Sequence, residues 1–331
     1  MPFFFALVLA AGFITPLFSA TPRASSGVLL VANKGDQTLG LVDPNSDRQI
    51  ATIHENGVTG HEVAASPDGK TAFVPIYGDS GVGLPGTDGS TIDVIDIAQR
   101  KLVHTIDFGH GVRPHCAVFN SKDGMLYVTT EIDKAIAIVD PKSMKIVGRV
   151  PTGEPESHML AISSDGRRGY TANVGPGTVS VLDLEGRKTL SIISVAKHIQ
   201  RIALSPDGRW AFTSDTEQPR MAVIDTAAGK VDRWIILPAA GYGAAATPDG
   251  KWLLVAVPEA NAVAVIDLAA MKVFKTVPVP QDPQEVLVRP DGEFAYVSCS
   301  RPHQVAAVRL RDWSVRVIDA GLGADGLAWA K

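Results

Sequence analysis

One short turn recurs along this chain at a fixed interval, and it limits the possible fold more than any other feature. Ser205-Pro206-Asp207-Gly208 is one copy of the turn, and Thr247-Pro248-Asp249-Gly250 is the next. The last five copies follow one another every 42 residues, whereas the first interval is 55 residues. A fixed period of this length is typical of solenoids and propellers. The aspartates of the six copies are Asp68, Asp123, Asp165, Asp207, Asp249 and Asp291.

The residues within each period predict four short strands. Proline presets φ and glycine accepts a positive φ, so the recurring turn favours a hairpin between two strands. A short apolar strand such as residues 202–204 precedes the turn, and another such as residues 294–297 follows it. A third strand ends in an aliphatic-aspartate signature, as in Val94-Ile95-Asp96, and a fourth follows, as in residues 102–106. Four strands per period without helical periodicity are typical of a β-propeller blade.

The two ends of the repeat region predict a seventh blade. Residues 28–53 contain a second, a third and a fourth strand, with no first strand ahead of them. Residues 325–330 are typical of a first strand with nothing after it. Joined together, the two segments form one blade and close the ring, which removes the free sheet edge between the first and last blades. We therefore predict an all-β, seven-bladed propeller with four-stranded antiparallel blades over residues 27–331.

These repeats resemble a known family. The recurring turns and aliphatic-aspartate strand ends, such as Val223-Ile224-Asp225, are similar to the YVTN-type propeller repeats of bacterial and archaeal surface and periplasmic proteins. The resemblance covers about residues 28–330, and it extends to propeller lactonases and to the propeller parts of some redox enzymes. It implies the fold, but relatives on this scaffold perform many different functions.

The first 26 residues differ from the rest and predict export. Residues 3–18 form a nearly continuous apolar run, and a loose tail rich in Ser and Ala follows it. This pattern resembles the apolar core of a signal peptide, and the run is short for a transmembrane helix. We therefore expect a periplasmic or secreted protein with no stable membrane span after signal cleavage.

Composition excludes some partners. The formal net charge is −4, and no stretch concentrates Lys and Arg, so nucleic acid is not an expected partner. Cys116 and Cys299 form no CxxC pattern and are interpreted as two buried free thiols. We expect a monomer whose partner is a small polar molecule or another protein.

Four histidines stand at the starts of first strands in four successive blades: His61, His115, His158 and His198. His61 and His158 lie seven residues before the turn aspartate, whereas His115 lies eight and His198 nine residues before it. Neutral imidazoles bind divalent transition metals, with Glu62 or water completing the shell. They also serve as general acids or bases near neutral pH. His61, His115 and His158 are therefore both the candidate catalytic residues and the candidate metal ligands.

In a propeller, the connections into the first strands and those between the second and third strands share one face. The face that carries these histidines therefore also carries an insertion. The longer first interval places 13 extra residues between a second and a third strand, within residues 77–90. Insertions on one face of a repeat protein commonly build its binding surface. Together with the loops of the other blades, this face supplies the candidate ligand-binding residues. They are Glu62, Tyr77, Asp79, Arg113, Asn173, His198, Tyr242 and Arg301.

Two functions remain open on this reading. The first is an exported propeller that binds a small polar ligand or a protein partner at its histidine-lined face. The second is a propeller enzyme, similar to a lactonase or lyase or dependent on a metal, that uses the clustered histidines. Plain structural hydrogen bonding of these histidines remains the alternative to both.

Overall fold

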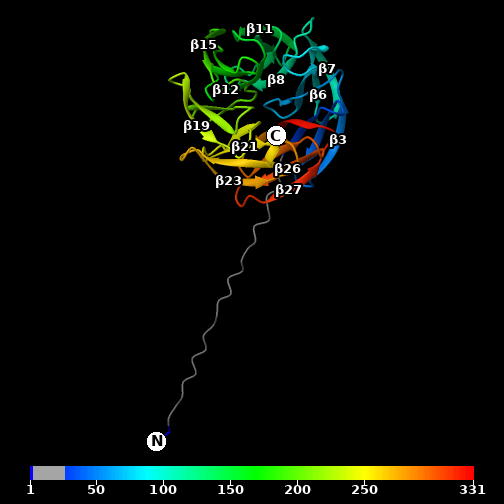
Figure 1. The fold of residues 1–331 in the computed structure, drawn as a ribbon. Coiled ribbons are helices and arrows are strands. Elements are labelled where there is room, and N and C mark those ends of the chain that lie inside the picture. Colours follow the sequence, from blue (N-terminus) through cyan, green and yellow to red (C-terminus); the bar gives the residue numbers. More distant parts are fainter. Residues whose placement is uncertain (3–26) are drawn as a thin grey trace.

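The computed structural model describes residues 1–2 and 27–331, and residues 27–331 form a ring of seven sheets around a central axis (Figure 1). Each sheet contains four antiparallel strands, so the predicted seven-bladed propeller is confirmed. The helical content of the described residues is one 3-10 turn, η1, at Pro258–Ala260. The predicted signal peptide lies outside the described residues, apart from Met1 and Pro2.

The ring closes as predicted, by pairing strands from the two ends of the repeat region. The closing blade has the order β28-β1-β2-β3, and β28 is its innermost strand. Val28 pairs with Ala330, and Leu30 pairs with Ala328, in an antiparallel register. The C-terminus therefore lies near the centre of the ring (Figure 1). The strands of this blade are β1 (Val28–Asn33), β2 (Thr38–Asp43), β3 (Arg48–His54) and β28 (Ala324–Ala330).

The recurring turn joins the first two strands of a blade by side-chain hydrogen bonds. The Ser66 hydroxyl donates to Asp68 at 2.6 Å and accepts from the Thr71 amide at 2.9 Å, while Gly69 has a φ of 70°.

The next three blades follow in chain order. The first contains β4 (Ala64–Ala65), β5 (Thr71–Gly78), β6 (Asp88–Asp96) and β7 (Lys101–Asp107). The second contains β8 (Pro114–Phe119), β9 (Leu126–Thr130), β10 (Ala135–Asp140) and β11 (Lys145–Pro151). The third contains β12 (Ser157–Ile162), β13 (Arg168–Asn173), β14 (Thr178–Asp183) and β15 (Lys188–Ser194).

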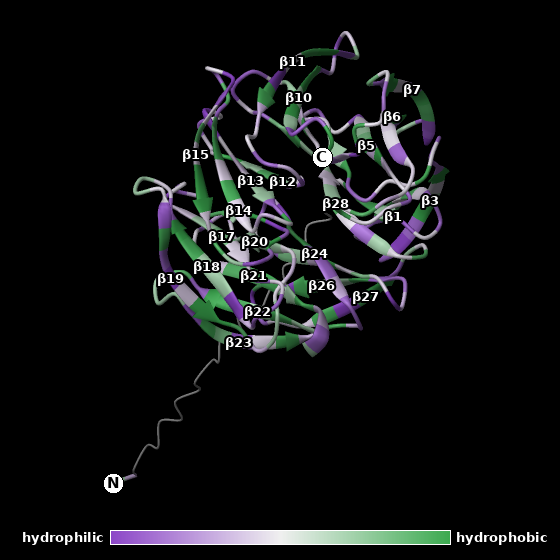
Figure 2. Cartoon of the chain, turned by 45° about the horizontal axis from the view of Figure 1, so that its top comes forward, coloured by the Kyte–Doolittle hydropathy of each residue, from purple (hydrophilic) through white to green (hydrophobic). Residues whose placement is uncertain are grey.

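The core lies between neighbouring blades. The second and third strands of each blade are buried on both faces, whereas the fourth strand alternates between exposed and partly buried residues. Apolar residues gather in the strands, and many connecting turns are hydrophilic (Figure 2).

Three further blades complete the ring. The first contains β16 (Ala203–Leu204), β17 (Trp210–Ser214), β18 (Arg220–Asp225) and β19 (Lys230–Ile236). The second contains β20 (Ala244–Ala246), β21 (Trp252–Val257), β22 (Ala262–Asp267) and β23 (Lys272–Pro278). The third contains β24 (Pro283–Val288), β25 (Phe294–Cys299), β26 (Gln304–Arg309) and β27 (Val315–Asp319).

Two local features depart from the simple repeat. Part of the insertion lengthens β5 and β6, which continue to a pairing between Gly78 and Asp88, and residues 79–87 form the loop between them. The turn after β8 is one residue longer than its equivalents, because the Gly124 amide bonds to the Asn120 carbonyl, whereas the Gly69 amide bonds to the Ser66 carbonyl.

Two further expectations concern the cysteines and the membrane. Cys116 and Cys299 are both free and buried, as expected. Within residues 1–2 and 27–331, no helix has the length and apolar character needed to cross a membrane.

Candidate functional site

Strand register identifies seven equivalent positions around the axis. In each blade, one equivalent residue of the second strand pairs with one residue of the first strand, as Phe73 does with Ala64 and Tyr127 does with Val118. The residue three positions before that partner is polar in every blade. We call these seven residues the axial ring: His61, His115, His158, Gln200, Tyr242, Gln284 and Asp325.

Three of these residues bring their imidazoles together. The ring centroids of His115 and His158 are 3.6 Å apart, and those of His61 and His115 are 5.4 Å apart. The Tyr77 ring lies beside them, with centroids 4.9 Å from His61 and 5.3 Å from His115. The register therefore places His115 at the same position as His61 and His158, and its different spacing comes from the longer turn after β8.

Burial keeps these histidines neutral. His115 and His158 are 2% and 3% exposed, whereas His61 is partly exposed. Burial lowers the pKa of His61 to about 4, and it lowers the pKa values of His115 and His158 well below their usual range. Nδ1 of both His115 and His158 is buried and has no hydrogen-bond partner among the described residues. Such atoms cost free energy unless something else satisfies them.

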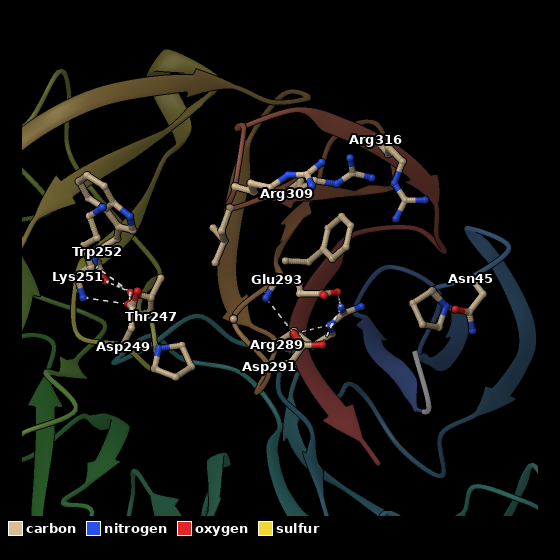
Figure 3. A pocket seen from close by; sticks show the side chains of 16 residues that line it. Asn45, Thr247, Asp249, Lys251, Trp252, Arg289, Asp291, Glu293, Arg309 and Arg316 are labelled. Carbon is tan, nitrogen blue, oxygen red and sulfur yellow. Dashed lines mark hydrogen bonds and ion pairs between the residues drawn. The ribbon is translucent and has the colours of Figure 1, made fainter. Parts of the chain in front are cut away.

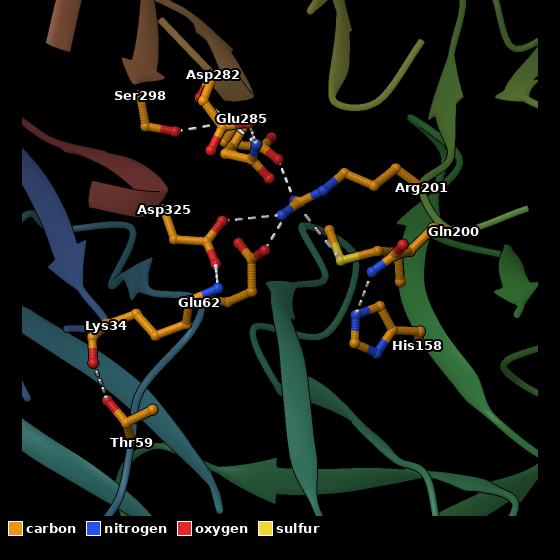
Figure 4. A network of polar contacts seen from close by, with 12 residues as sticks. Lys34, Thr59, Glu62, His158, Gln200, Arg201, Asp282, Glu285, Ser298 and Asp325 are labelled. Atoms are coloured by element: carbon orange, nitrogen blue, oxygen red, sulfur yellow. Dashed lines mark hydrogen bonds and ion pairs between the residues drawn. The ribbon is translucent and has the colours of Figure 1, made fainter. Parts of the chain in front are cut away.

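Beside the histidines, one buried arginine connects four blades. Arg201 follows Gln200 of the axial ring and donates to Glu62 at 2.7 Å, to Asp325 at 3.2 Å and to Glu285 (Figure 4). We call Arg201, Glu62, Glu285 and Asp325 the arginine cluster. Lys34 also pairs with Asp325 at 3.3 Å, and the Arg201 guanidinium lies 4.9 Å from the centroid of the Tyr242 ring.

The arginine cluster contains more carboxylates than its arginine can balance. Burial raises the pKa of Glu62 to about 8, and the neighbouring Glu285 and Asp325 carboxylates add to this effect against the opposing Arg201 charge. Burial also raises the pKa of Glu285. Glu62 therefore holds a proton near neutral pH, which relieves repulsion between carboxylates around one guanidinium.

The inserted loop, residues 79–87, is held against the neighbouring blade, which contains His115. Arg113 donates to Asp88 at 2.6 Å and to the Leu84 carbonyl at 2.7 Å, and it pairs with Glu131 at 3.2 Å. Glu131 also accepts from the Tyr77 hydroxyl and from the Gly83 amide. Because these bonds lie at the base and the tip of the loop, the loop is a fixed wall beside the histidines.

Removing this clamp should free the loop. In an Arg113→Ala variant, we expect the amides of residues 79–87 to exchange with solvent at least about tenfold faster, because bonds to charged groups contribute about 1.5–3 kcal/mol. Hydrogen exchange followed by mass spectrometry measures this directly. Arg149→Ala is the control, since Arg149 is half exposed and pairs with Asp133 rather than with a residue of the loop. Unchanged exchange in the Arg113 variant would contradict the clamp.

Some of the other residues predicted from the sequence lie near the axial ring or the inserted loop, and the rest lie away from both. Glu62, Tyr77 and Tyr242 lie at or beside the axial ring, and Arg113 lies behind the inserted loop. Asp79 accepts from the Thr87 amide at 2.6 Å within that loop. Asn173 is buried and bonds to Ser157, Thr171, Thr178 and Ser180 of its own blade. Arg301 is 76% exposed and lies 3.8 Å from Asp282.

His198 does not join the other histidines. Its Nδ1 lies 2.7 Å from the Glu217 carboxylate, and its side chain is 39% exposed. The axial position of its blade belongs to Gln200, whose amide nitrogen lies 3.4 Å from Nε2 of His158. The nine-residue spacing of His198 from its turn aspartate therefore reflects a position two residues outside the axial ring.

The metal hypothesis concerns the three converging imidazoles. Neutral histidine is the form that binds metal. However, within the part of the chain that the structure describes, no group of three or more His, Cys, Asp or Glu residues is placed to hold a metal ion. His61, His115 and His158 as metal ligands therefore remain a prediction from the sequence.

Arg201 is the residue that sequence reasoning missed. It lies just before the apolar first strand β16 and matches no catalytic motif. One signal was present: Arg201, Glu62 and Glu285 each lie four residues before the first residue of their blade's turn, which is Ser205, Ser66 and Arg289 respectively. Charged residues at one repeat position of an inner strand indicate interactions across the axis.

Comparisons with known proteins support the propeller fold, but they identify no family and no specific function. No family model and no curated protein matches the chain. A solved structure of Kuenenia stuttgartiensis hydrazine synthase is similar over 81% of this chain and 89% of that chain, with 18% identity and a TM-score of 0.67. The dihydro-heme d1 dehydrogenase NirN, solved in complex with DHE, is similar over 94% of this chain and 76% of that chain, with 14% identity and a TM-score of 0.64. Identities this low establish the propeller fold alone.

Proposed function

We propose that this protein binds a small polar molecule at the axial ring, beside the inserted loop. The observation that carries the proposal is the pair of buried imidazoles, His115 and His158, whose Nδ1 atoms have no hydrogen-bond partner within residues 27–331. Buried polar atoms in native proteins nearly always have a partner. A ligand that exchanges hydrogen bonds with both rings supplies the missing partners.

The charge around the ring selects among polar ligands. Among the arginine cluster, the adjacent Lys34 and the Arg113 contacts of the inserted loop, the cations are Lys34, Arg113 and Arg201, and the carboxylates other than the protonated Glu62 are Asp88, Glu131, Glu285 and Asp325. Carboxylates outnumber cations, so an anionic ligand would meet repulsion here. A neutral or positively charged molecule with several hydrogen-bonding groups fits the site best.

The N-terminal segment and the repeats support a location for this protein outside the cytoplasm. The apolar run within residues 3–18 is typical of a signal peptide, and the repeats resemble YVTN-type propellers of surface and periplasmic proteins. We therefore propose that the protein meets its ligand in the periplasm or outside the cell. The NirN structure, which contains DHE, is one propeller with a bound small molecule.

A catalytic role is the second candidate, favoured by the contact between His61, Tyr77 and His115. His61 is the partly exposed member of the three imidazoles, and its pKa of about 4 leaves it neutral at pH 7. A neutral imidazole accepts a proton or holds a metal. Elemental analysis of protein purified without chelators tests the metal-dependent form of this candidate: stoichiometric metal that is lost in His61→Ala would support it.

The binding proposal is tested by ligand-dependent thermal stability. A panel of neutral and cationic small molecules is screened against the parent and against a His115→Leu/His158→Leu variant. A molecule present at 100 times its Kd should stabilise the parent by about 2.7 kcal/mol, and it should leave the variant unchanged.

The matched control is His54→Ala/His104→Ala, because both residues are exposed on fourth strands. This variant should respond to ligand as the parent does. Equal stabilisation of the parent and the His115→Leu/His158→Leu variant by every active compound would exclude the axial ring as the binding site.

A further inference from the structure

A cavity of about 1160 Å³ lies on the face of the propeller opposite the axial histidines. Its walls come from turns between first and second strands and between third and fourth strands, which lie at the other ends of the strands from the inserted loop. Three blades contribute to it, so it spans two blade boundaries. Figure 3 shows Arg309 and Arg316 on one side of this cavity and Arg289 on the other.

Three guanidinium groups gather around one aromatic ring in this cavity. The Arg289, Arg316 and Arg309 guanidinium carbons lie 4.9, 5.1 and 5.5 Å from the centroid of the Phe294 ring. Like charges this close repel one another, and the cation–π attraction of one ring offsets this only in part. A negative group placed between them would therefore be attracted by all three.

Much of the donor capacity of these arginines is unused by the protein. Arg309 approaches Asp312 only at 3.7 Å, which is longer than a hydrogen bond. Arg316 donates through Nη1 to Asp47 at 2.6 Å, but its Nε is buried with no partner among the described residues. Arg289 is the exception, because it is bonded to both Asp291 and Glu293.

The acidic residues at the rim do not close the site to an anion. Asp291 and Glu293 are 47% and 66% exposed, and Asp312 is 43% exposed. Exposed ion pairs contribute only about 0–1 kcal/mol, so an incoming anion can compete for the arginines. A guanidinium fork binds two oxygens of a phosphate, sulfate or carboxylate at once.

We propose that this cavity binds an organic oxyanion whose charged group lies between Arg309 and Arg316 and whose body is apolar or aromatic. The walls support such a body, because Phe294, Trp252 and Leu310 line the cavity with Pro44 and Pro248. Typical small-molecule sites measure about 300–1000 Å³, so this volume accommodates a ligand larger than a bare phosphate. The site is distinct from the axial ring in position and in the sign of the charge that it favours.

Titration calorimetry with small aryl anions tests this site. Phenyl phosphate, phenyl sulfate and benzoate are compared with phenol and with inorganic phosphate. We expect saturable binding of at least one aryl anion, none of phenol, and weaker binding of inorganic phosphate. Arg309→Gln and Arg316→Gln should each weaken the aryl anion's binding at least about tenfold, and raising the salt concentration should weaken it in the parent.

Two controls separate this cavity from other sites. Arg233→Gln removes a half-exposed arginine that pairs with Asp232 on a fourth strand, and it should leave binding unchanged. The His115→Leu/His158→Leu variant should also bind the aryl anion normally. Absence of saturable binding by all three aryl anions, or binding that persists in both arginine variants, would overturn the proposal.

Discussion

Replacing Arg201 by methionine should lower the free energy of unfolding by about 3–5 kcal/mol, the largest effect that we expect from a single substitution in this protein. Arg201 is the shared partner of Glu62, Glu285 and Asp325, which are all buried or nearly so. Without it, the buried carboxyl groups must either stay ionised without their counter-charge or take up further protons, and both cost folding free energy. Denaturant unfolding at pH 8 measures the loss.

The origin of this loss is tested by neutralising the acids. Adding Glu62→Gln and Glu285→Gln to Arg201→Met should restore part of the stability, because the remaining charge is then Asp325 with Lys34 beside it. Arg233→Met, on the exposed outer surface, should cost less than about 1 kcal/mol. A loss below that value for Arg201→Met as well would show that the arginine cluster contributes little.

The two buried histidines should make the protein sensitive to acid. The folded-state pKa values of His115 and His158 lie well below the unfolded value of about 6.5, so their contribution to stability is present above that pH and is lost as pH falls. Each adds about 1.4 kcal/mol per pH unit to the dependence of unfolding free energy on pH. Below about pH 6.5, a His115→Gln/His158→Gln variant should therefore show a smaller slope than the parent, by up to about 2.7 kcal/mol per pH unit.

The comparison must be made between variants, because acidic groups act in the opposite direction. Glu62 has a pKa raised to about 8, so its contribution to stability is present at low pH and is lost as pH rises. This term is present in both proteins and cancels in the difference. His54→Gln/His104→Gln, which changes two exposed histidines, should keep the parent's slope, and an equal slope in the buried pair's variant would contradict the burial argument.

The fold was predictable because it depends on local chemistry that repeats. Each turn carries its own side-chain hydrogen bonds, such as Ser205 to Asp207, so the sequence around it defines a hairpin without reference to distant residues. The seventh blade was predictable because the last repeat ends in a first strand with no second strand after it, and the first repeat has three strands but no first strand. The two segments complete each other in a single blade. The lengthening of β5 and β6 into the insertion was not predicted, since Gly and Asp residues there favour turns over strands.

The site was predictable only where it follows the repeat. His61 and His158 share a spacing from the turn aspartate, whereas His115 did not match because its turn contains one more residue. Counting back from the first turn residue, Ser66, Asn120 or Ser163, gives the same five-residue spacing for all three histidines. The partners of Arg201 are 84 to 139 residues away, and only the ring geometry brings them together.

The closing strand β28 has a consequence for when the protein can bind. It supplies Asp325 to the axial ring and also pairs with β1 to close the circle. A chain still being synthesised, or one whose seam has opened, therefore lacks the inner strand of its closing blade and a residue of the axial ring at the same time. Under the proposed function, a ligand at the axial ring would stabilise the closed ring, so its release and the separation of β28 from β1 would be coupled.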